Sequence, residues 1–396
     1  MTMLTQYGLD FQDYLIFLVL HNNPLASPNQ IAKELDLTPE TIRRRITRLK
    51  KHHFLRPDRT VNDPLLGERI QTEVEAIYVP QYIGLLRLHV FFHKVTSPSA
   101  LEKLIELCEV HPYTHYRAVT YGEGMDFYSQ FDVPPEIIGE MEKLFEELKT
   151  QKLFKKYSII KTNYVVRSCL NFNNWSFNFN DWSLVDRSPL GLPNQLETLW
   201  KNFIENHDVA KPKKVTPTFK GRFDEIDMKL LRELSINGKV SSTFLENIYD
   251  RDVTTISRRL KNLKEKVALN YVLYYDRSAF NLDYIQMVSG KLKPDDELNL
   301  NTFTGFLESG LLPFETNLVI DGNNFIWYMH TPSSYAPMIT DFIWKHASEV
   351  RIYQFYTQIA RTYYFYYENY LGRKKWRTDE EYVLDTPLKI MFTRKK

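Results

Sequence analysis

Two stretches of the chain, 214 residues apart, carry hydrophobic positions with the same helical spacing. In the first, positions i, i+4 and i+7 form one stripe: Ile42, Ile46 and Leu49. In the second, the same spacing gives Ile256, Leu260 and Leu263. Such a stripe is buried when a helix packs on its neighbours. Together with the similarity of residues 11–19 to residues 223–231, this pattern predicts a tandem duplication in which each half opens with three short helices.

Sequence signals mark where the helices of the first unit begin. The segment Ser27-Pro-Asn-Gln30 has the composition of a capping box with proline at the first helical position. The segment Thr38-Pro-Glu40 starts the next helix in the same way. Only two or three residues separate these two helices, which is the spacing of a helix-turn-helix.

A strand–helix–strand–strand–helix–strand order follows each unit. In the first half we predict strands at about 85–94, 113–121, 125–133 and 155–166, and helices at about 98–110 and 135–153. In the second half we predict strands near 284–293, 314–320, 325–331 and 351–365, and helices near 298–309 and 335–348. Tight turns at 121–125 and 321–324 join the middle strands. This order is the ferredoxin-like split βαβ arrangement.

The predicted fold class is α+β, with two winged helix-turn-helix domains alternating with two ferredoxin-like βαββαβ sensor domains. The expected domains are 1–75 (winged helix-turn-helix), 76–170 (ferredoxin-like), 171–222 (aromatic tail, helix and linker), 223–275 (winged helix-turn-helix), 276–368 (ferredoxin-like) and 369–396 (C-terminal tail). A helix is expected at 191–206 and a flexible basic linker at 208–222. Because each predicted sheet is apolar on both faces, the two sensor domains are expected to pair sheet against sheet within the chain.

Composition and charge narrow the choice of function. The 396 residues are 43% hydrophobic and 25% charged, so the chain has the means to bury sizeable cores. The net charge of +2 neither favours nor excludes nucleic acid, and only local clusters of charge are informative. Two cysteines cannot make a disulfide framework, and no zinc-site spacing is present, so we expect a cytoplasmic protein without a metal or cofactor. The longest early apolar run has seven residues, which is too short to span a membrane.

The third helix of the first unit is strongly cationic outside its buried stripe, and it carries a single acid, Glu40. Such a helix fits the major groove of double-stranded DNA, where arginine reads guanine edges and Lys or Arg neutralises phosphates. The residues predicted to contact DNA are Thr38, Thr41, Arg43, Arg44, Arg45, Arg48, Lys50 and Lys51 in the first unit, and Thr254, Thr255, Ser257, Arg258, Arg259 and Lys261 in the second. The first unit, which has more cations, is expected to dominate affinity. The alternative is a solvated surface helix.

These residues resemble the Lrp/AsnC (feast/famine) transcription regulators. The resemblance rests on residues 31–42, with Asp36 where the family often has glycine, and on residues 223–234 and 255–263. It implies a DNA-binding regulator in which two units form an intrachain pseudo-dimer, with an amino-acid effector and a homo-oligomer as further partners. The family's ligand-binding turn corresponds to Gly122 and Asp126 in the first half and to Gly322 in the second. A simple tight turn is the alternative role of these glycines.

Two rival functions remain open. Siroheme decarboxylases are similar to this family and combine two such modules, and an enzyme of that kind needs histidine and arginine side chains for a substrate with several carboxylates. The first half offers the candidates His89, His93, His111, His115 and Arg117, and the second sensor domain offers His330 and His346. Most of these histidines are expected to be structural or solvated. The other rival is an interaction scaffold whose helical units do not bind DNA.

Overall fold

The computed structural model describes residues 7–168, 170–178, 181–182, 195–207, 214–267, 269–293 and 299–393. The first head consists of helices α2 (Phe11–Asn22), α3 (Pro28–Leu35) and α4 (Pro39–Lys51). A β-hairpin of β1 (Arg59–Asp63) and β2 (Gly67–Gln71) follows, and then the strand β3 (Val74–Ile77). The predicted helix starts are confirmed, because Ser27 and Gln30 form a capping box and the Thr38 side chain accepts from the Thr41 backbone N–H.

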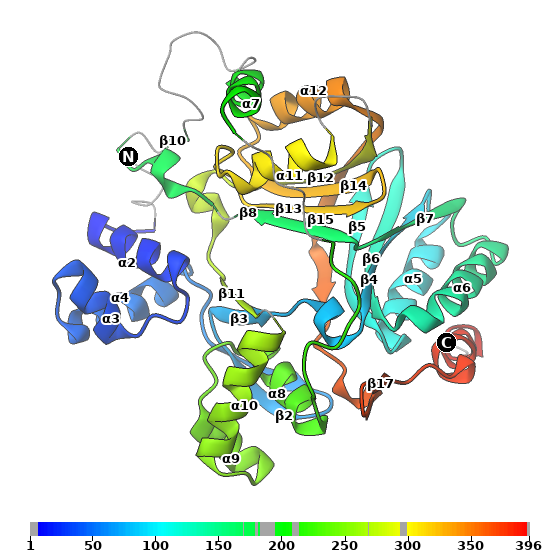
Figure 1. Cartoon of the computed structure of the whole chain (residues 1–396), viewed down its shortest axis with the longest axis horizontal. Helices are drawn as coiled ribbons and strands as arrows, with labels where there is room; N and C mark the ends of the chain where they lie inside the picture. The colour runs from blue at the N-terminus through cyan, green and yellow to red at the C-terminus, as the bar shows by residue number, and fades with distance from the viewer. Residues whose placement is uncertain are drawn as a thin grey trace.

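The second head repeats this plan with α8 (Glu225–Ile236), α9 (Ser242–Tyr249) and α10 (Val253–Lys266), followed by the strand β11 (Asn270–Leu273). The two stripes named above are inside the heads: Ile42, Leu49, Ile256 and Leu263 have no exposed surface. The heads lie apart in Figure 1, with α2–α4 on the left and α8–α10 at the bottom.

The sensor layer has the predicted order of elements in both halves. The first half provides β4 (Leu86–His93), α5 (Pro98–Val110), β5 (Thr114–Tyr121), β6 (Met125–Val133), α6 (Ile138–Thr150), β7 (Lys156–Lys161) and β8 (Tyr164–Ser168). The second provides β12 (Tyr284–Leu292), α11 (Leu300–Glu308), β13 (Thr316–Asp321), β14 (Asn324–Thr331), α12 (Ala336–His346) and β15 (Ala347–Thr362). The strand predicted at 155–166 is divided into β7 and β8.

The strands form one sheet in the order β7-β4-β6-β5-β15-β12-β14-β13-β8. Both end strands, β7 and β8, come from the first half, and the two halves join where β15 pairs with β5 and where β8 pairs with β13. We call β7-β4-β6-β5 the first sheet and β15-β12-β14-β13, with β8 at its edge, the second sheet. An inter-sheet cluster between their inner faces consists of Phe91, Tyr128, Ile160, Met287, Val319, Ile326 and Tyr353. The predicted pairing of sheet against sheet is confirmed.

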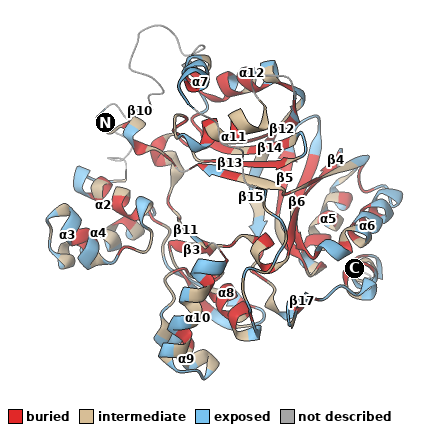
Figure 2. Cartoon of the chain, in the orientation of Figure 1, coloured by how far each residue is buried: buried red, intermediate tan, exposed pale blue. Residues whose placement is uncertain are grey.

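The outer faces of the sheets are covered by helices. In Figure 1, α5 and α6 lie against the first sheet on the right, and α11 and α12 lie against the second at the top. Figure 2 shows buried residues concentrated in the strands and on the inner sides of these helices. Within the described residues, no helix is long and apolar enough to cross a membrane.

The heads exchange segments between the two halves. Strand β3 of the first half pairs with β11 of the second, from Val74 opposite Leu273 to Ile77 opposite Asn270. The first head packs on residues that follow β11, and Phe17 stacks on Phe280 at 5.1 Å. One core joins the first head to the second sensor module, and another joins the second head to the first sensor module. The domain boundary expected at 75 thus falls inside β3, and neither head is completed by its own half.

The β1–β2 hairpin docks on the second head through buried ion pairs. Arg232 of α8 donates to the Asp63 carboxylate, with Nη2 2.5 Å from Oδ2, and neither side chain is more than 1% exposed. Arg69 on β2 donates to Glu233 at 2.9 Å. The hairpin of the first half therefore serves the second head.

Tail segments also cross between the halves. Helix α7 (Gln195–Asn206), which confirms the helix predicted at 191–206, packs on α11 and α12 through Trp200. The π-helical turn η7 (Glu381–Asp385) and helix α13 (Thr386–Thr393) pack on α5 and α6. In the predicted linker, residues 214–222 are not free: backbone N–H groups of Val215, Thr218 and Lys220 donate to carbonyls at Asn163 and at residues 81–82. Residues 208–213 lie outside the described part.

Candidate nucleic-acid interface and pockets

Half of the cations on α4 are free to face a partner. Arg43, Arg44 and Lys51 are exposed, while Arg45, Arg48 and Lys50 are only partly exposed. Arg43 makes a surface pair with Glu40 at 3.2 Å, and both of its partners remain well solvated. Arg44 and Lys51 have no ion pair or hydrogen bond within the described residues. The cationic face of α4 is therefore narrower than its sequence suggests.

Arg45 holds the first head together. Its guanidinium donates to Asp10 at 2.9 Å and to Asp13 at 2.8 Å, and the Asp13 side chain has no exposed surface. Burial acts to raise the pKa of Asp10, but the Asp13 backbone N–H and Arg45 outweigh it and lower that pKa below its ordinary value. The side chain predicted to read bases instead joins α4 to the start of α2.

Arg48 and Lys50 are tied in a similar way. Arg48 lies 3.3 Å from Asp13 and also donates to the Gly8 carbonyl. Lys50 lies 2.8 Å from Asp58 and 2.8 Å from Glu73, a nearly buried carboxylate. These three residues were predicted as DNA contacts, and the structure gives each of them an intramolecular carboxylate partner.

The second head repeats the same division. Arg259 donates to Asp224 and Asp227, both at 2.9 Å, and thereby reproduces the Arg45 arrangement at an offset of 214 residues. Thr254, Ser257, Arg258 and Lys261 are exposed on α10, and so is Lys264. Asp252 caps the start of α10, because its side chain accepts from the Thr255 backbone N–H. The exposed cations are three on α4 (Arg43, Arg44 and Lys51) and four on α10 (Arg258, Lys261, Lys264 and Lys266), so the expected excess of the first head is not present on the surface.

Comparison with known proteins identifies the first head. Residues 9–56 match the profile of a family described as winged helix-turn-helix DNA-binding. The first head is a winged helix-turn-helix. No curated protein sequence matches the chain.

Solved structures are similar to the chain at the level of fold. The siroheme decarboxylase NirDL is 15% identical, covers 90% of this chain and 96% of its own, and gives a TM-score of 0.46. An AsnC family transcriptional regulator from Agrobacterium tumefaciens is 16% identical over 39% of this chain and 89% of its own, with a TM-score of 0.27. A transcriptional regulator from Neisseria meningitidis in complex with L-Met is 15% identical over 39% of this chain and 88% of its own, with a TM-score of 0.28. The winged helix-turn-helix that the resemblance to Lrp/AsnC regulators implies for the first head is confirmed by the family match over residues 9–56.

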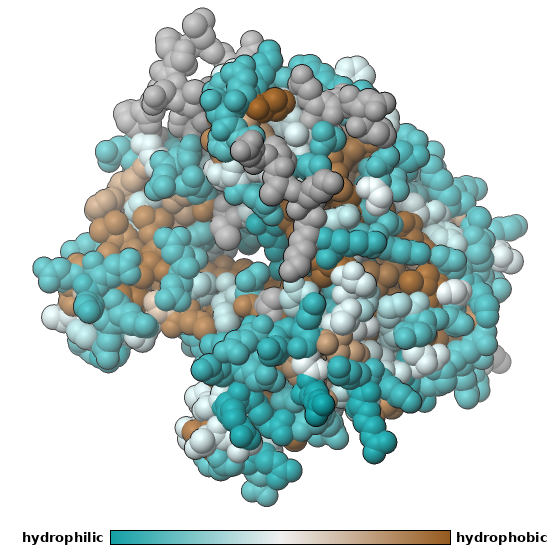
Figure 3. Space-filling model, in the orientation of Figure 1, coloured by the Kyte–Doolittle hydropathy of each residue, from teal (hydrophilic) through white to brown (hydrophobic). Residues whose placement is uncertain are grey.

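The surfaces of the two heads differ in polarity. Figure 3 shows a hydrophobic area around α2 of the winged helix-turn-helix and mostly hydrophilic side chains over the second head. At the start of α2, the Phe11 side chain is 53% exposed and contacts the ring of Phe177.

A distal pocket lies at the end of the sensor layer formed by the β5–β6 turn and the start of β15. It has a volume of about 230 Å³ and is lined by His93, Lys94, Gly122, Glu123, Asp126, Val350, Arg351, Ile352 and Tyr353. Asp126 is buried and already accepts from the Lys94 backbone N–H at 2.7 Å. Glu123 lies between two cations, 3.5 Å from Lys94 and 3.8 Å from Arg351. The pocket therefore brings together the predicted residues Gly122 and Asp126 with exposed groups of both charges.

The corresponding turn of the second half, around Gly322, is bound by residues of the first half. Gly322 has a φ of 59° and open space around it, which is the role of a tight-turn glycine. The neighbouring Asp321 accepts from the Lys161 backbone N–H at 3.0 Å and from the Asn163 amide at 2.5 Å. The aspartate beside this turn is therefore bound by the end of β7 and by the residue before β8.

The histidines proposed for an enzyme do not gather in one place. His93 lines the distal pocket, whereas His111 is buried near η7 and burial lowers its pKa to about 3. Arg117 donates to Tyr363 and Glu109, away from the other candidates. His330 lies on the inner face of β14 beside Tyr328, and His346 is at the end of α12 next to Glu197.

Two of the candidates, His89 and His115, do meet at the head-facing end of the first sheet. His89 contacts Tyr128 at 2.6 Å and Thr162 at 3.0 Å, and His115 Nδ1 lies 3.6 Å from Asp132. Burial lowers the pKa of both imidazoles to about 3, so both are neutral at pH 7.

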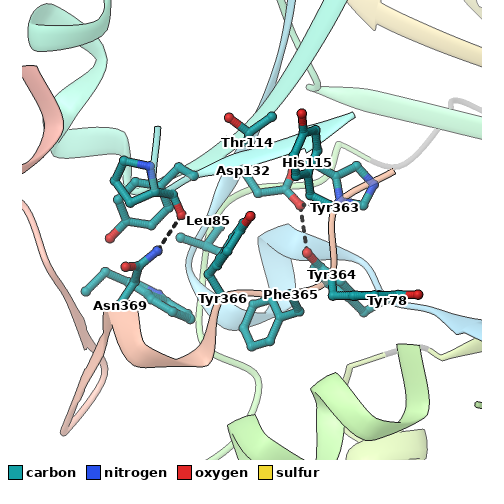
Figure 4. A pocket seen from close by; sticks show the side chains of 13 residues that line it. Tyr78, Leu85, Thr114, His115, Asp132, Tyr363, Tyr364, Phe365, Tyr366 and Asn369 are labelled. Carbon is teal, nitrogen blue, oxygen red and sulfur yellow. Dashed lines mark hydrogen bonds and ion pairs between the residues drawn. The ribbon is translucent and has the colours of Figure 1, made fainter. Parts of the chain in front are cut away.

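Asp132 is the centre of a network that sequence reasoning missed. Arg87 binds its carboxylate with two bonds of 2.7 and 2.8 Å, and Tyr78 donates to it at 2.8 Å. Although burial acts to raise it, the Arg87 charge lowers the pKa of Asp132 to about 2. Asp132 and His115 line a small hinge pocket whose other wall is the segment after β15, Tyr363–Tyr366, as Figure 4 shows. A signal was present, since Arg87 is an arginine between Leu86 and Leu88 in a strand that is mostly apolar.

Proposed function

We propose that the chain is a sequence-specific DNA-binding transcription regulator. The observation that carries this proposal is the pair of recognition helices, each of which keeps exposed cations after its structural ion pairs are subtracted. Arg44 on α4 and Arg258 on α10 stand at equivalent positions, next to the arginine that is tied to the preceding helix. An arginine so placed on a recognition helix suits a guanine edge in the major groove.

The two heads form a pseudo-dimer with two different surfaces. A symmetric dimer favours a palindromic site, whereas two different helices favour two different half-sites. The heads are joined through β3 and β11 and through the sensor layer, so their separation is set by the fold. We expect an asymmetric operator with half-sites separated by a whole number of helical turns.

The effector belongs in the distal pocket. A zwitterionic amino acid needs a cation for its carboxylate and a carboxylate for its ammonium group. Arg351 and Lys94 offer the first, and Glu123 offers the second. Because Arg351 comes from the second half and Glu123 from the first, a ligand here would contact both sensor modules, and it would shift the head arrangement if it bound alternative arrangements unequally.

The test of DNA binding uses the full chain. Genome-wide mapping of bound DNA supplies candidate operators, and duplex titration at several salt concentrations measures their affinity. Arg44→Ala and Arg258→Ala should each weaken specific binding by about 1–3 kcal/mol. Lys156→Gln, an exposed cation on β7 far from both recognition helices, serves as the control. Full retention of affinity in the Arg44→Ala, Arg258→Ala double variant would contradict the proposal.

A siroheme-decarboxylase-like enzyme is the second candidate. The observation in its favour is that His89, His115 and Arg87 converge at one end of the first sheet. Mixing the chain with siroheme and recording absorbance in the Soret region tests this candidate directly. An unchanged spectrum excludes it, and a shifted spectrum with loss of carbon dioxide from the substrate establishes it.

A further inference from the structure

Two polar side chains, those of Arg167 and Asn317, lie between the inner faces of the two sheets at the end near the heads, and we call the space around them the recess. Arg167 on β8 stands directly opposite Asn317 on β13. Val165 and Val319 share faces with these two residues and pack into the inter-sheet cluster. Because alternate residues of a strand point to the same side, Arg167 and Asn317 face the space between the sheets. Arg167 nevertheless keeps an exposed side chain, so water reaches this space.

Each carboxylate near Arg167 already has a guanidinium of its own. Arg87 binds Asp132 through two bonds, and Arg277 binds Glu315 at 2.7 and 3.2 Å. Arg167 has neither a hydrogen bond nor an ion pair within the described residues. A guanidinium stays protonated at neutral pH, so Arg167 carries its charge there.

The other groups around the recess add no charge. Burial lowers the pKa of His89 and His115 to about 3 and that of His330 to about 4, so all three are neutral at pH 7. The Asn317 Oδ1 atom is buried and has no hydrogen-bond donor within the described residues. Buried polar atoms are rarely left without a partner. The recess thus combines one uncompensated cation with one acceptor that lacks a donor.

We propose that this recess is a binding site for a small carboxylate that carries a hydroxyl or ammonium group beside its carboxylate. The carboxylate pairs with the Arg167 guanidinium, whose planar fork matches two carboxylate oxygens. The neighbouring hydroxyl or ammonium group donates to Asn317 Oδ1. The site is separate from the distal pocket, which lies at the opposite end of the sensor layer around Gly122.

The recess lies near the segments that follow the exchanged strands β3 and β11. Tyr78 comes directly after β3 and donates to Asp132, the partner of Arg87. Arg277 comes shortly after β11 and binds Glu315, two residues before Asn317 on the same strand face. A bound anion would therefore interact with the charges that fasten the exchanged strands to the sensor layer.

The experiment measures thermal shifts and calorimetric binding for four probes on the full chain: L-malate, citrate, L-aspartate and succinate. We expect the first three to bind and succinate, which lacks the second donor, to bind at least tenfold more weakly. Arg167→Gln should lower malate affinity by about 10- to 100-fold, the loss of one charge-assisted interaction. Asn317→Leu should remove the preference for malate over succinate while leaving succinate affinity unchanged. Lys156→Gln should change neither.

The melting temperature of the protein without ligand distinguishes a binding role of Arg167 from a structural one, because the two roles predict opposite changes in Arg167→Gln. If the role of Arg167 is to bind a ligand, Arg167→Gln removes an uncompensated charge from the free protein. The melting temperature of this variant without ligand should then equal or exceed that of the parent. A melting temperature several degrees lower would show that Arg167 stabilises the fold, and would overturn the proposal. Enzymes commonly bind metabolites with constants up to about 1 mM. If none of the four probes binds at a concentration tenfold above that value, the proposal is overturned as well. Either outcome leaves the duplex titrations of the recognition helices to be judged separately.

Discussion

Replacement of Arg45 by alanine should destabilise the winged helix-turn-helix without a specific effect on base recognition. Arg45 is the main donor to the fully buried Asp13 carboxylate, and a hydrogen bond to a charged group contributes about 1.5–3 kcal/mol. Arg48 remains 3.3 Å from Asp13 and offsets part of the loss. The pair with Asp10 contributes little, because that carboxylate is 49% exposed. We therefore expect a loss of about 2 kcal/mol in the free energy of unfolding.

The assay compares two adjacent arginines of one helix. Urea unfolding of the full chain gives the stability of each variant, and duplex titration gives its affinity. Arg44→Ala should leave the free energy of unfolding within about 0.5 kcal/mol of the parent and lose affinity, whereas Arg45→Ala should do the reverse. Arg258 and Arg259 provide the same contrast in the second head. An Arg45→Ala variant of unchanged stability that loses as much affinity as Arg44→Ala would refute the structural role.

Three further changes test other parts of the fold. The pKa of His89 is about 3 in the folded chain and near 6.5 in the unfolded chain, so only the unfolded chain binds a proton at this residue as the pH falls from 7 to 5. This proton binding lowers the free energy of unfolding by about 2 kcal/mol. His89→Gln should make the difference in stability between pH 7 and pH 5 smaller, as measured by urea unfolding at the two pH values. Arg232→Met should cost about 3 kcal/mol and speed hydrogen exchange in residues 59–71, with partial recovery when Asp63→Leu is added; unchanged exchange would argue against docking of the hairpin. Gly84→Ala should lower the melting temperature more than Gly67→Ala, because both glycines have positive φ but only a Cβ at Gly84 overlaps an aromatic ring of the 214–222 segment.

Local patterns in the sequence predicted most elements of the fold, because each element depends on neighbouring residues. The turns around Gly122 and Gly322, the capped helix starts and the alternating strands are all of this kind. The exchange of β3 and β11 was not predictable in the same way. Both strands are four residues long, and the sequence of neither strand indicates that it pairs with a strand almost two hundred residues away. Pairing at that distance is decided by packing of the whole molecule.

The DNA interface was predicted at the level of helices but not of individual side chains. Composition shows that α4 is cationic, whereas only coordinates show which cations are neutralised by the protein itself. One signal in the sequence was available: Asp10, Asp13 and Arg45 recur as Asp224, Asp227 and Arg259, all at one offset of 214. A charge triplet that survives a duplication together is typical of an internal contact, and it would have separated Arg45 from Arg44.

The exchange of segments also governs how the chain must be made. The first head is closed by Phe280 and by Asp276, which accepts from Tyr7 at 2.5 Å although the two residues are 269 positions apart. Synthesis proceeds from the N-terminus at about 5–20 residues per second, so the first head waits on the order of 10–60 s for residues that complete its core. During that interval its apolar surface is open to chaperones and to the same surface of other nascent chains. Because each head is completed by the other half, a substitution in one half affects the stability of both. If the gene were split between the halves, the exchange of segments would require two polypeptides to assemble.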